Sequence, residues 1–318
     1  MIQIFVNANY DFVGKRRWFY LASLAAVVVS ILSIAGHRGL NYGIDFTGGM
    51  LIQVRYDKPV TVADVRRGLD ELKLGQGVIQ QYGDDREYLI RLPETQGKSE
   101  ALVGVIQGAL AKVSQSQVEV RRAEFVGPQV GRDLQLQALY AVLAGMVGIL
   151  IYVAIRFDFR GGVISIAALF HDVMVALGAL SITNREISLP VLAALLTIVG
   201  YSINDTIVVF DRIRETRGRG LRKGQTLSDM VNGAINQTLS RTILTSFTTF
   251  LAALVLFLFG GEVLHDFAFA LVIGVVTGTY SSVAAASLVM DWELWSRRRS
   301  RAPAKVAVKA ERMAAKKS

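Results

Sequence analysis

The chain has 318 residues, of which 52% are hydrophobic and 19% are charged, whereas about a quarter of the residues in soluble domains are charged. It has no cysteine, which excludes disulfides, thiolate metal sites and cysteine nucleophiles. The formal net charge is +9, which in a soluble protein would raise the question of nucleic acid binding. The distribution of that charge gives a different explanation.

Six apolar runs are long enough to cross a bilayer, which takes about 20 residues. They are approximately Trp18–Gly36, Leu134–Ile155, Val163–Thr183, Pro190–Arg212, Thr242–Gly260 and His265–Trp292. The first run is longer than the apolar core of a signal peptide, so we interpret it as an uncleaved anchor. The runs predict an α-helical polytopic membrane protein with six transmembrane helices.

The surplus basic residues lie on tails and loops that six spans would place on one side of the membrane. By the positive-inside rule that side is the cytosol, so the charge is a topology signal and nucleic acid is not needed to explain it. The predicted division is a cytosolic segment 1–17, a first span 18–36, a periplasmic domain 37–133, spans two to six within 134–296 with a cytosolic loop 213–241, and a basic cytosolic tail 297–318.

The predicted periplasmic domain has the element order β-α-β-β-α-β, which is typical of a small α+β ferredoxin-like domain. The expected strands are Met50–Tyr56, Val78–Tyr82, Glu87–Leu92 and Val118–Val126. One helix begins at Thr61, where Asp64 completes a capping box, and the other begins at Ser99. No nucleophile, metal cluster or phosphate loop is evident, so we expect no cofactor, no metal and no enzyme.

The segment between the fourth and fifth runs contains a further helix signal. Thr226 with Asp229 forms a second capping pattern, and apolar residues follow at helical spacing as far as Leu239. We expect a short amphipathic helix that lies on the inner membrane surface.

Asn204, Asp205 and Thr206 form a polar triplet inside the fourth apolar run. At ~1.5 Å of rise per residue, Asp205 lies about 22 Å from Pro190 and about 10 Å from Arg212, within the bilayer and displaced toward one face. A carboxylate at such a depth costs roughly 2.5–3.5 kcal/mol on insertion scales, and intramembrane acids usually mark ion or proton paths. The alternative is a buried polar residue that only holds helices together.

The third run carries two more titratable groups, His171 and Asp172, about 12–14 Å in from Val163. Histidine has the side-chain pKa nearest neutrality. The two residues either take part in a proton relay with Asp205 or form a fixed polar contact between helices. Both interpretations remain open.

The fifth run begins with Arg241 and is dense in hydroxyls. These are Thr242, Thr245, Ser246, Thr248 and Thr249, of which all but Ser246 share one helical face with Arg241. The stripe predicts a wet crevice that faces Asp205. Alternatively, Arg241 snorkels to headgroups and the hydroxyls bond back to their own helix. A movement that changes the distance between Arg241 and Asp205 would change the proton affinity of the carboxylate.

Glycines in two runs predict close helix packing, because small residues let helix backbones approach. Gly274 and Gly278 form a Gly-x-x-x-Gly pair in the sixth run, and Gly145 and Gly148 lie in the second. For the second run, the general frequency of glycine in membrane helices is nearly as good an explanation.

Several stretches together resemble the SecF family of membrane subunits, which work with SecD beside the bacterial Sec protein translocon. They are Asp45-Phe46-Thr47-Gly48-Gly49, the run from Gly200 to Glu215 that contains Asn204-Asp205-Thr206, His171-Asp172, Arg241-Thr242, and Leu258-Phe259-Gly260-Gly261. The resemblance covers residues 5–295. The basic tail after Trp292 matches no motif of the family and receives no function.

The resemblance implies half of a resistance-nodulation-division (RND) transporter in the bacterial inner membrane. It implies that the proton-motive force drives movements of outer domains that help to export preproteins. Asp205 matches the proton-carrying aspartate of the family, and Arg241 its basic partner. The implied partners are SecD, the SecYEG channel and YajC through the SecD–SecF complex, the preprotein and the lipid bilayer.

Two other classes of function stay open on the sequence. One is an RND-like exporter of a small molecule or lipid that acts as an oligomer. The other is a scaffold of the translocon that transduces no energy, which predicts that charge-removing changes at Asp205 and Arg241 are tolerated. An enzyme is the least supported class.

Overall fold

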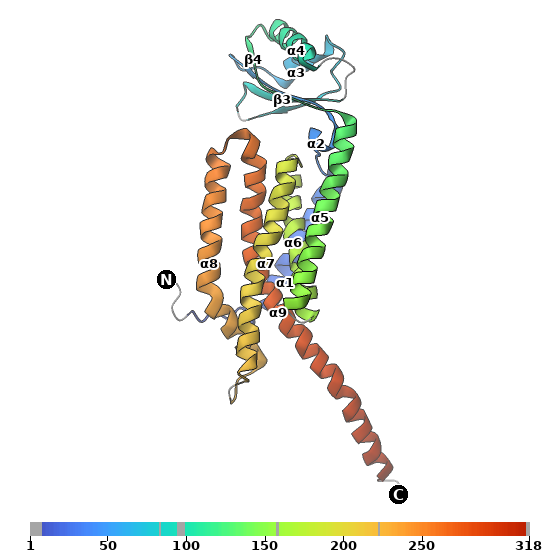
Figure 1. Ribbon diagram of the computed structural model, residues 1–318, viewed down its shortest axis with the longest axis vertical. Helices are drawn as coiled ribbons and strands as arrows, with labels where there is room; N and C mark the ends of the chain where they lie inside the picture. Colours follow the sequence, from blue (N-terminus) through green and yellow to red (C-terminus); the bar gives the residue numbers. More distant parts are fainter. Residues whose placement is uncertain (1–7, 83, 94–98, 157–158, 222, 316–318) are drawn as a thin grey trace. The chain divides into compact units, whose positions relative to one another are not determined.

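The structure is a computed structural model that describes residues 8–82, 84–93, 99–156, 159–221 and 223–315 (Figure 1). Parts of both predicted terminal segments, residues 1–7 and 316–318, lie outside the described residues. The described chain forms two compact units. The helical unit contains the described parts of Met1–Leu40, Leu143–Arg185 and Pro190–Ser318, and the α+β unit contains those of Asn41–Val142 and Glu186–Leu189.

Six helices in the described chain are long and apolar enough to cross a membrane, which confirms the predicted number of spans. They are α1 (Arg16–Gly36), α5 (Pro128–Arg156), α6 (Phe159–Ile182), α7 (Leu189–Gly218), α8 (Leu227–Phe259) and α9 (Gly261–Ala315). In the helical unit, α6, α7 and α9 bury many side chains, whereas in α1 only Ser30 is buried and large apolar side chains such as Leu21 and Leu32 are exposed. Apolar side chains exposed in this way are suited to contact with acyl chains.

The predicted short amphipathic helix is wrong as a separate element. Residues from Leu227 onward are the first turns of α8, which continues without a break to Phe259. The predicted capping box is present, with Thr226 and Asp229 exchanging hydrogen bonds. The apolar side chains of this part pack within the protein instead of lying on a membrane surface. They share one hydrophobic cluster with side chains of α7 and α9, and its members include Phe210, Ile213, Met230, Ile235 and Met290.

The glycine pair of α9 packs closely against α7, as predicted. A Cβ on Gly274 would lie 2.2 Å from Ile198 Cγ1, and one on Gly278 would lie 3.1 Å from Ser202 Cβ. In α5 the prediction of close packing is wrong, because a Cβ on Gly148 would meet nothing within 4 Å and one on Gly145 only a leucine methyl at 3.8 Å. The general frequency of glycine in membrane helices explains the α5 pair.

Gly274→Ala is expected to destabilise the helical unit by about 1–3 kcal/mol, the usual cost of overpacking a filled site. The added methyl group must displace Ile198, whose branched side chain occupies that space. Thermal unfolding of the purified protein in detergent measures the effect. Gly200→Ala is the matched control, because a Cβ there meets nothing within 4 Å. Equal unfolding temperatures for the two variants would contradict close packing at Gly274.

The α+β unit contains a four-stranded antiparallel sheet in the order β2-β3-β1-β4, which confirms the ferredoxin-like prediction. The strands are β1 (Gly49–Tyr56), β2 (Val78–Gln81), β3 (Glu87–Leu92) and β4 (Val118–Val126), and the helices are α2 (Ile44–Thr47), α3 (Val62–Asp70) and α4 (Ser99–Ser114). One face of the sheet and the two longer helices enclose a core that includes Ile52, Val54, Leu69, Ile90 and Ile106.

The predicted capping box at the start of α3 is also present. Thr61 accepts the Asp64 backbone N–H, and the Asp64 carboxylate accepts the Thr61 hydroxyl at 2.6 Å and its backbone N–H at 3.1 Å. These hydrogen bonds, together with Arg67, lower the pKa of Asp64 from 3.8 to about 2. Local sequence therefore fixes this helix start, because the cap involves residues only three apart.

Candidate functional site

Asp205 lies on α7 and its side chain is enclosed by the helical unit, with the residue only 1% exposed. The hydroxyl of Ser246, from α8, donates a hydrogen bond to Asp205 Oδ2 at 3.2 Å. Thr279, from α9, donates in turn to Ser246 at 2.7 Å. Three helices therefore meet at this carboxylate, and hydroxyl groups provide the polar links between them.

Asp172 is a second enclosed carboxylate, on α6, and is 0% exposed. Ser202 of α7 and Ser281 of α9 both donate to its Oδ2 atom, the latter at 2.8 Å. His171 Nδ1 lies 2.9 Å from the other oxygen, Oδ1. Both oxygens therefore have partners, as a buried carboxylate requires.

The two carboxylates are linked through α7 and α9: Asp205 lies on α7, and Asp172 accepts hydroxyls from both helices. Ser202 and Asp205 are three residues apart on α7 and so lie on one face of that helix. On α9, Thr279 donates to Ser246 beside Asp205, and Ser281 donates to Asp172. We call this set the buried carboxylate network, and its members are Asp172, Ser202, Asp205, Ser246, Thr279 and Ser281. A shift of α7 or α9 would alter the hydrogen bonds of both carboxylates.

Sequence reasoning missed the hydroxyls of α9. A signal for them was present, because Thr277, Thr279, Ser281 and Ser282 surround the second glycine of the Gly-x-x-x-Gly pair. The same pair brings α9 against α7 at Ser202. Hydroxyls next to a close helix contact therefore predict groups that face the neighbouring helix.

The hydroxyls of the predicted α8 stripe make no hydrogen bond to Asp205 in the part of the chain that the structure describes. Thr245, Thr248 and Thr249 all donate to backbone carbonyls of their own helix, which was the alternative interpretation. A hydroxyl in apolar surroundings reaches the carbonyl one turn earlier more easily than a distant partner. Ser246, which lies off that face, provides the contact with Asp205. Thr242 is buried.

The other two members of the triplet lie differently. Thr206 is buried beside Asp205, with 1% exposure, whereas Asn204 is on an exposed face of α7. Asn204 has no part in the buried carboxylate network.

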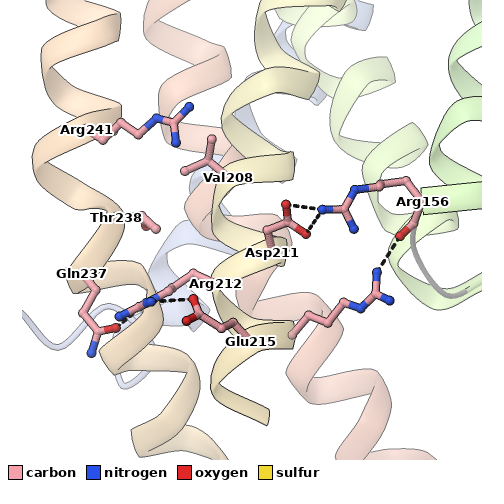
Figure 2. A pocket seen from close by; sticks show the side chains of 9 residues that line it. Arg156, Val208, Asp211, Arg212, Glu215, Gln237, Thr238 and Arg241 are labelled. Carbon is pink, nitrogen blue, oxygen red and sulfur yellow. Dashed lines mark hydrogen bonds and ion pairs between the residues drawn. The ribbon is translucent and has the colours of Figure 1, made fainter. Parts of the chain in front are cut away.

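Arg241 lies at an open cavity of about 720 Å³ next to α7 and α8 (Figure 2). The residues that line the cavity are Arg156, Val208, Asp211, Arg212, Arg214, Glu215, Gln237, Thr238 and Arg241. In Figure 2 the Arg241 side chain extends from α8 toward α7 near Val208. Val208 is three residues beyond Asp205 on the same helix, so the cavity begins about one turn from the carboxylate.

Most charged groups of this cavity are paired with one another. Arg156 pairs with Asp211, and Arg212 pairs with Glu215 and donates to Gln237 at 2.6 Å. No ion pair joins Arg241 to Asp205 in the part of the chain that the structure describes. Arg241 is therefore not a direct partner of the Asp205 carboxylate.

The motif Asp45-Phe46-Thr47-Gly48-Gly49 lies in the α+β unit, over α2 and the start of β1. Gly48 and Gly49 have φ angles of 69° and 112°, a region that favours glycine. A Cβ on Gly49 would also lie 2.4 Å from the Leu92 carbonyl oxygen. The glycines therefore serve the backbone, and Asp45 is the titratable group of the motif.

Comparisons with known proteins agree with this architecture. A family model described as "Protein export membrane protein SecD/SecF, C-terminal" matches residues 105–295, and one described as "SecD/SecF GG Motif" matches residues 34–60. Protein translocase subunit SecF of Calditerrivibrio nitroreducens is 47% identical over 283 residues, which cover 88% of this chain and 93% of the relative. The subunit of the same name from Magnetococcus marinus is 46% identical over 304 residues, which cover 94% and 97%.

A solved structure has the same fold over most of this chain. The crystal structure of SecDF from Thermus, described as a translocon-associated membrane protein, superposes with a TM-score of 0.80 at 42% identity. The match covers 90% of this chain but 39% of that one. The Thermus chain is thus much longer than the part to which this chain corresponds.

Proposed function

We propose, for a chain that belongs to the SecF family of protein translocase subunits, that it couples the proton-motive force to preprotein export across the bacterial inner membrane. The observation that carries the coupling is the burial of Asp172 and Asp205 among spans, with hydroxyls from neighbouring helices as partners. The relatives are named as translocase subunits, a name that denotes no enzymatic reaction.

Protonation is the switch in this proposal. An ionised carboxylate in a low-dielectric interior requires strong polar partners, whereas the neutral acid requires fewer. Gain of a proton at Asp205 would therefore favour a different arrangement of α7, α8 and α9, and loss would restore the first. Moving one charge through a potential of 100 mV is worth ~2.3 kcal/mol, which shifts such an equilibrium nearly 50-fold.

Arg241 and the cavity beside it supply the connection to water. The cavity opens next to four arginines and begins about one turn from Asp205. His171 and Asp172 extend the relay toward α6 and α9.

The membrane topology follows from charge. We place both termini and the cavity with its arginines in the cytosol, and the α+β domain in the periplasm, because basic residues stay on the cytosolic side. The domain boundaries predicted from the sequence are part of this proposal, with a cytosolic segment 1–17 and a basic tail 297–318.

The proposed partners are SecD and, through the SecD–SecF complex, the SecYEG channel, YajC and the preprotein. The size of the match supports SecD, because the Thermus SecDF chain contains much more than this chain covers. Six spans would then be completed by a second half in a separate subunit.

The proposed function is tested with inner-membrane vesicles that contain or lack the protein. Preprotein transport is measured with and without a protonophore. We expect the part of transport that depends on the protein to disappear when the protonophore collapses the proton gradient. If the protein-dependent part of transport were unchanged by the protonophore, the protein would instead be a scaffold that transduces no energy.

A further inference from the structure

The short loop between α6 and α7 belongs to the α+β unit, not to the helical unit that its flanking spans form. Its residues are Glu186–Leu189, and Leu189 is the first residue of α7. Residues 41–45, which precede and enter the glycine motif and which we call the motif segment, contact this loop, and so does β3. The start of a membrane-spanning helix is therefore held by the α+β domain.

Backbone hydrogen bonds make the first part of this attachment. Ile187 donates its N–H to the Asn41 carbonyl at 2.7 Å, and Gly43 donates to the Ile187 carbonyl at 2.9 Å. Tyr42 and Ile187 thus form a parallel β-bridge. Ile187 is buried, so water does not compete readily for these bonds.

Asp45 provides the second contact that attaches the loop to the α+β unit. Its Oδ2 atom accepts the backbone N–H of Leu189 at 2.8 Å. The first N–H groups of a helix have no partner within the helix, and a carboxylate there also complements the helix dipole. Asp45 therefore caps α7 from a distant position in the sequence, whereas Thr61, the cap of α3, directly precedes its helix.

An ion pair between the sheet and the loop provides the third contact. Arg91, on the internal strand β3, pairs with Glu186, and the two side chains are 12% and 17% exposed. Arg91 also donates to Asn41 Oδ1 at 2.9 Å. The loop and the motif segment are thus tied to the sheet by one guanidinium group. We call the set Asn41, Asp45, Arg91 and Glu186–Leu189 the α7 clamp.

We propose that Asp45 and Arg91 are positioning residues that fasten the start of α7 to the α+β domain, so that a displacement of this helix is passed to the domain. Asp205 lies sixteen residues after Leu189 on the same helix, about 24 Å along its axis. A helix is stiff over that length, so a shift at the carboxylate reaches the clamp. The inference rests on the proposed function, since that function requires movement in the membrane to reach a domain outside it.

The clamp can be broken and rebuilt covalently. Asp45→Ala removes the cap, and the pair Gly43→Cys with Ser188→Cys replaces it with a disulfide. A Cβ on Gly43 would lie 3.7 Å from Ser188 Cβ, within the range of about 3.5–4.5 Å for a disulfide. Gly43 has φ −71° and ψ 172°, which cysteine also adopts. The chain has no other cysteine, so the engineered bond is the only one that forms within it.

Proton-driven preprotein transport is measured in vesicles with the full chain in its complex. We expect Asp45→Ala to lower it about tenfold, a typical size of coupling between two sites. Asp64→Ala is the matched control, since it removes the carboxylate half of the capping box of a helix that does not enter the membrane, and its transport should match the parent. The oxidised disulfide should leave the parental rate intact, restore transport to the Asp45→Ala variant, and lose that rescue on reduction.

Parental transport in Asp45→Ala, no rescue despite complete disulfide formation, or inhibition of the parent by the disulfide would each overturn the inference. Arg91→Gln provides a second break if Asp45→Ala does not accumulate. A readout that needs no transport separates this inference from the proposed function. Hydrogen exchange at the Leu189 amide should be faster in Asp45→Ala and unchanged in Asp64→Ala. Unchanged exchange in both would reject the clamp, whereas parental transport in Asp205→Asn would reject proton coupling.

Discussion

Asp205→Asn is expected to abolish the part of preprotein transport that the proton-motive force drives. The amide has nearly the size of the carboxylate, and its oxygen can still accept the Ser246 hydroxyl. It cannot gain or lose a proton at physiological pH, so the two arrangements of the spans no longer differ in proton affinity. The measurement is transport into vesicles under an imposed proton gradient, and the expected rate is that of the parent with protonophore.

The variant should otherwise resemble the parent. It should insert into the membrane and copurify with SecD in parental amounts, because the buried packing around position 205 is kept. Thr197→Val is the matched control on the same helix, since Thr197 is exposed and its hydroxyl bonds, among the described residues, only to the Ala193 carbonyl. Transport by Asp205→Asn at the parental rate would show that Asp205 takes no part in proton coupling.

Asp172→Asn is expected to lower proton-driven transport by about tenfold or more, within the usual range for loss of one coupled site. The amide oxygen can accept the Ser202 and Ser281 hydroxyls, and the amide NH₂ can face His171 if that ring changes tautomer. The substitution therefore removes the charge and the proton site while the packing stays. The same vesicle assay measures it.

Ser165→Ala is the control for the Asp172 variant. Ser165 lies seven residues earlier on α6, is also buried, and its hydroxyl has no hydrogen-bond partner among the described residues. Its removal should leave transport and stability unchanged. Parental transport in Asp172→Asn would instead make Asp172 and His171 a fixed polar contact between helices, the other interpretation that the sequence left open.

Local patterns predicted the elements of this protein well. The strands Glu87–Leu92 and Val118–Val126 are found with the predicted bounds, and both capping boxes are present. These features depend on alternation, on residues three apart and on apolar runs of membrane length. All of that information lies within one short segment of chain.

The features that were predicted wrongly or missed depend on contacts between segments that are far apart in the sequence. The apolar face at the start of α8 looks the same whether it meets lipid or α7, and only tertiary packing decides between them. The hydroxyls of α8 were assigned to Asp205 by helical face, yet Ser246 from outside that face makes the contact. The clamp joins Asp45 to Leu189, which are 144 residues apart in the sequence. Motif spacing cannot predict a contact between residues so far apart.

The most direct test of proton coupling is proton movement itself. The complex is reconstituted into liposomes with a pH-sensitive dye inside, and preprotein-dependent proton flux is recorded under an imposed gradient for the parent and for Asp205→Asn. The account predicts flux with the parent and none above background with the variant. Equal flux in both would contradict it, because protons would then cross without binding at position 205.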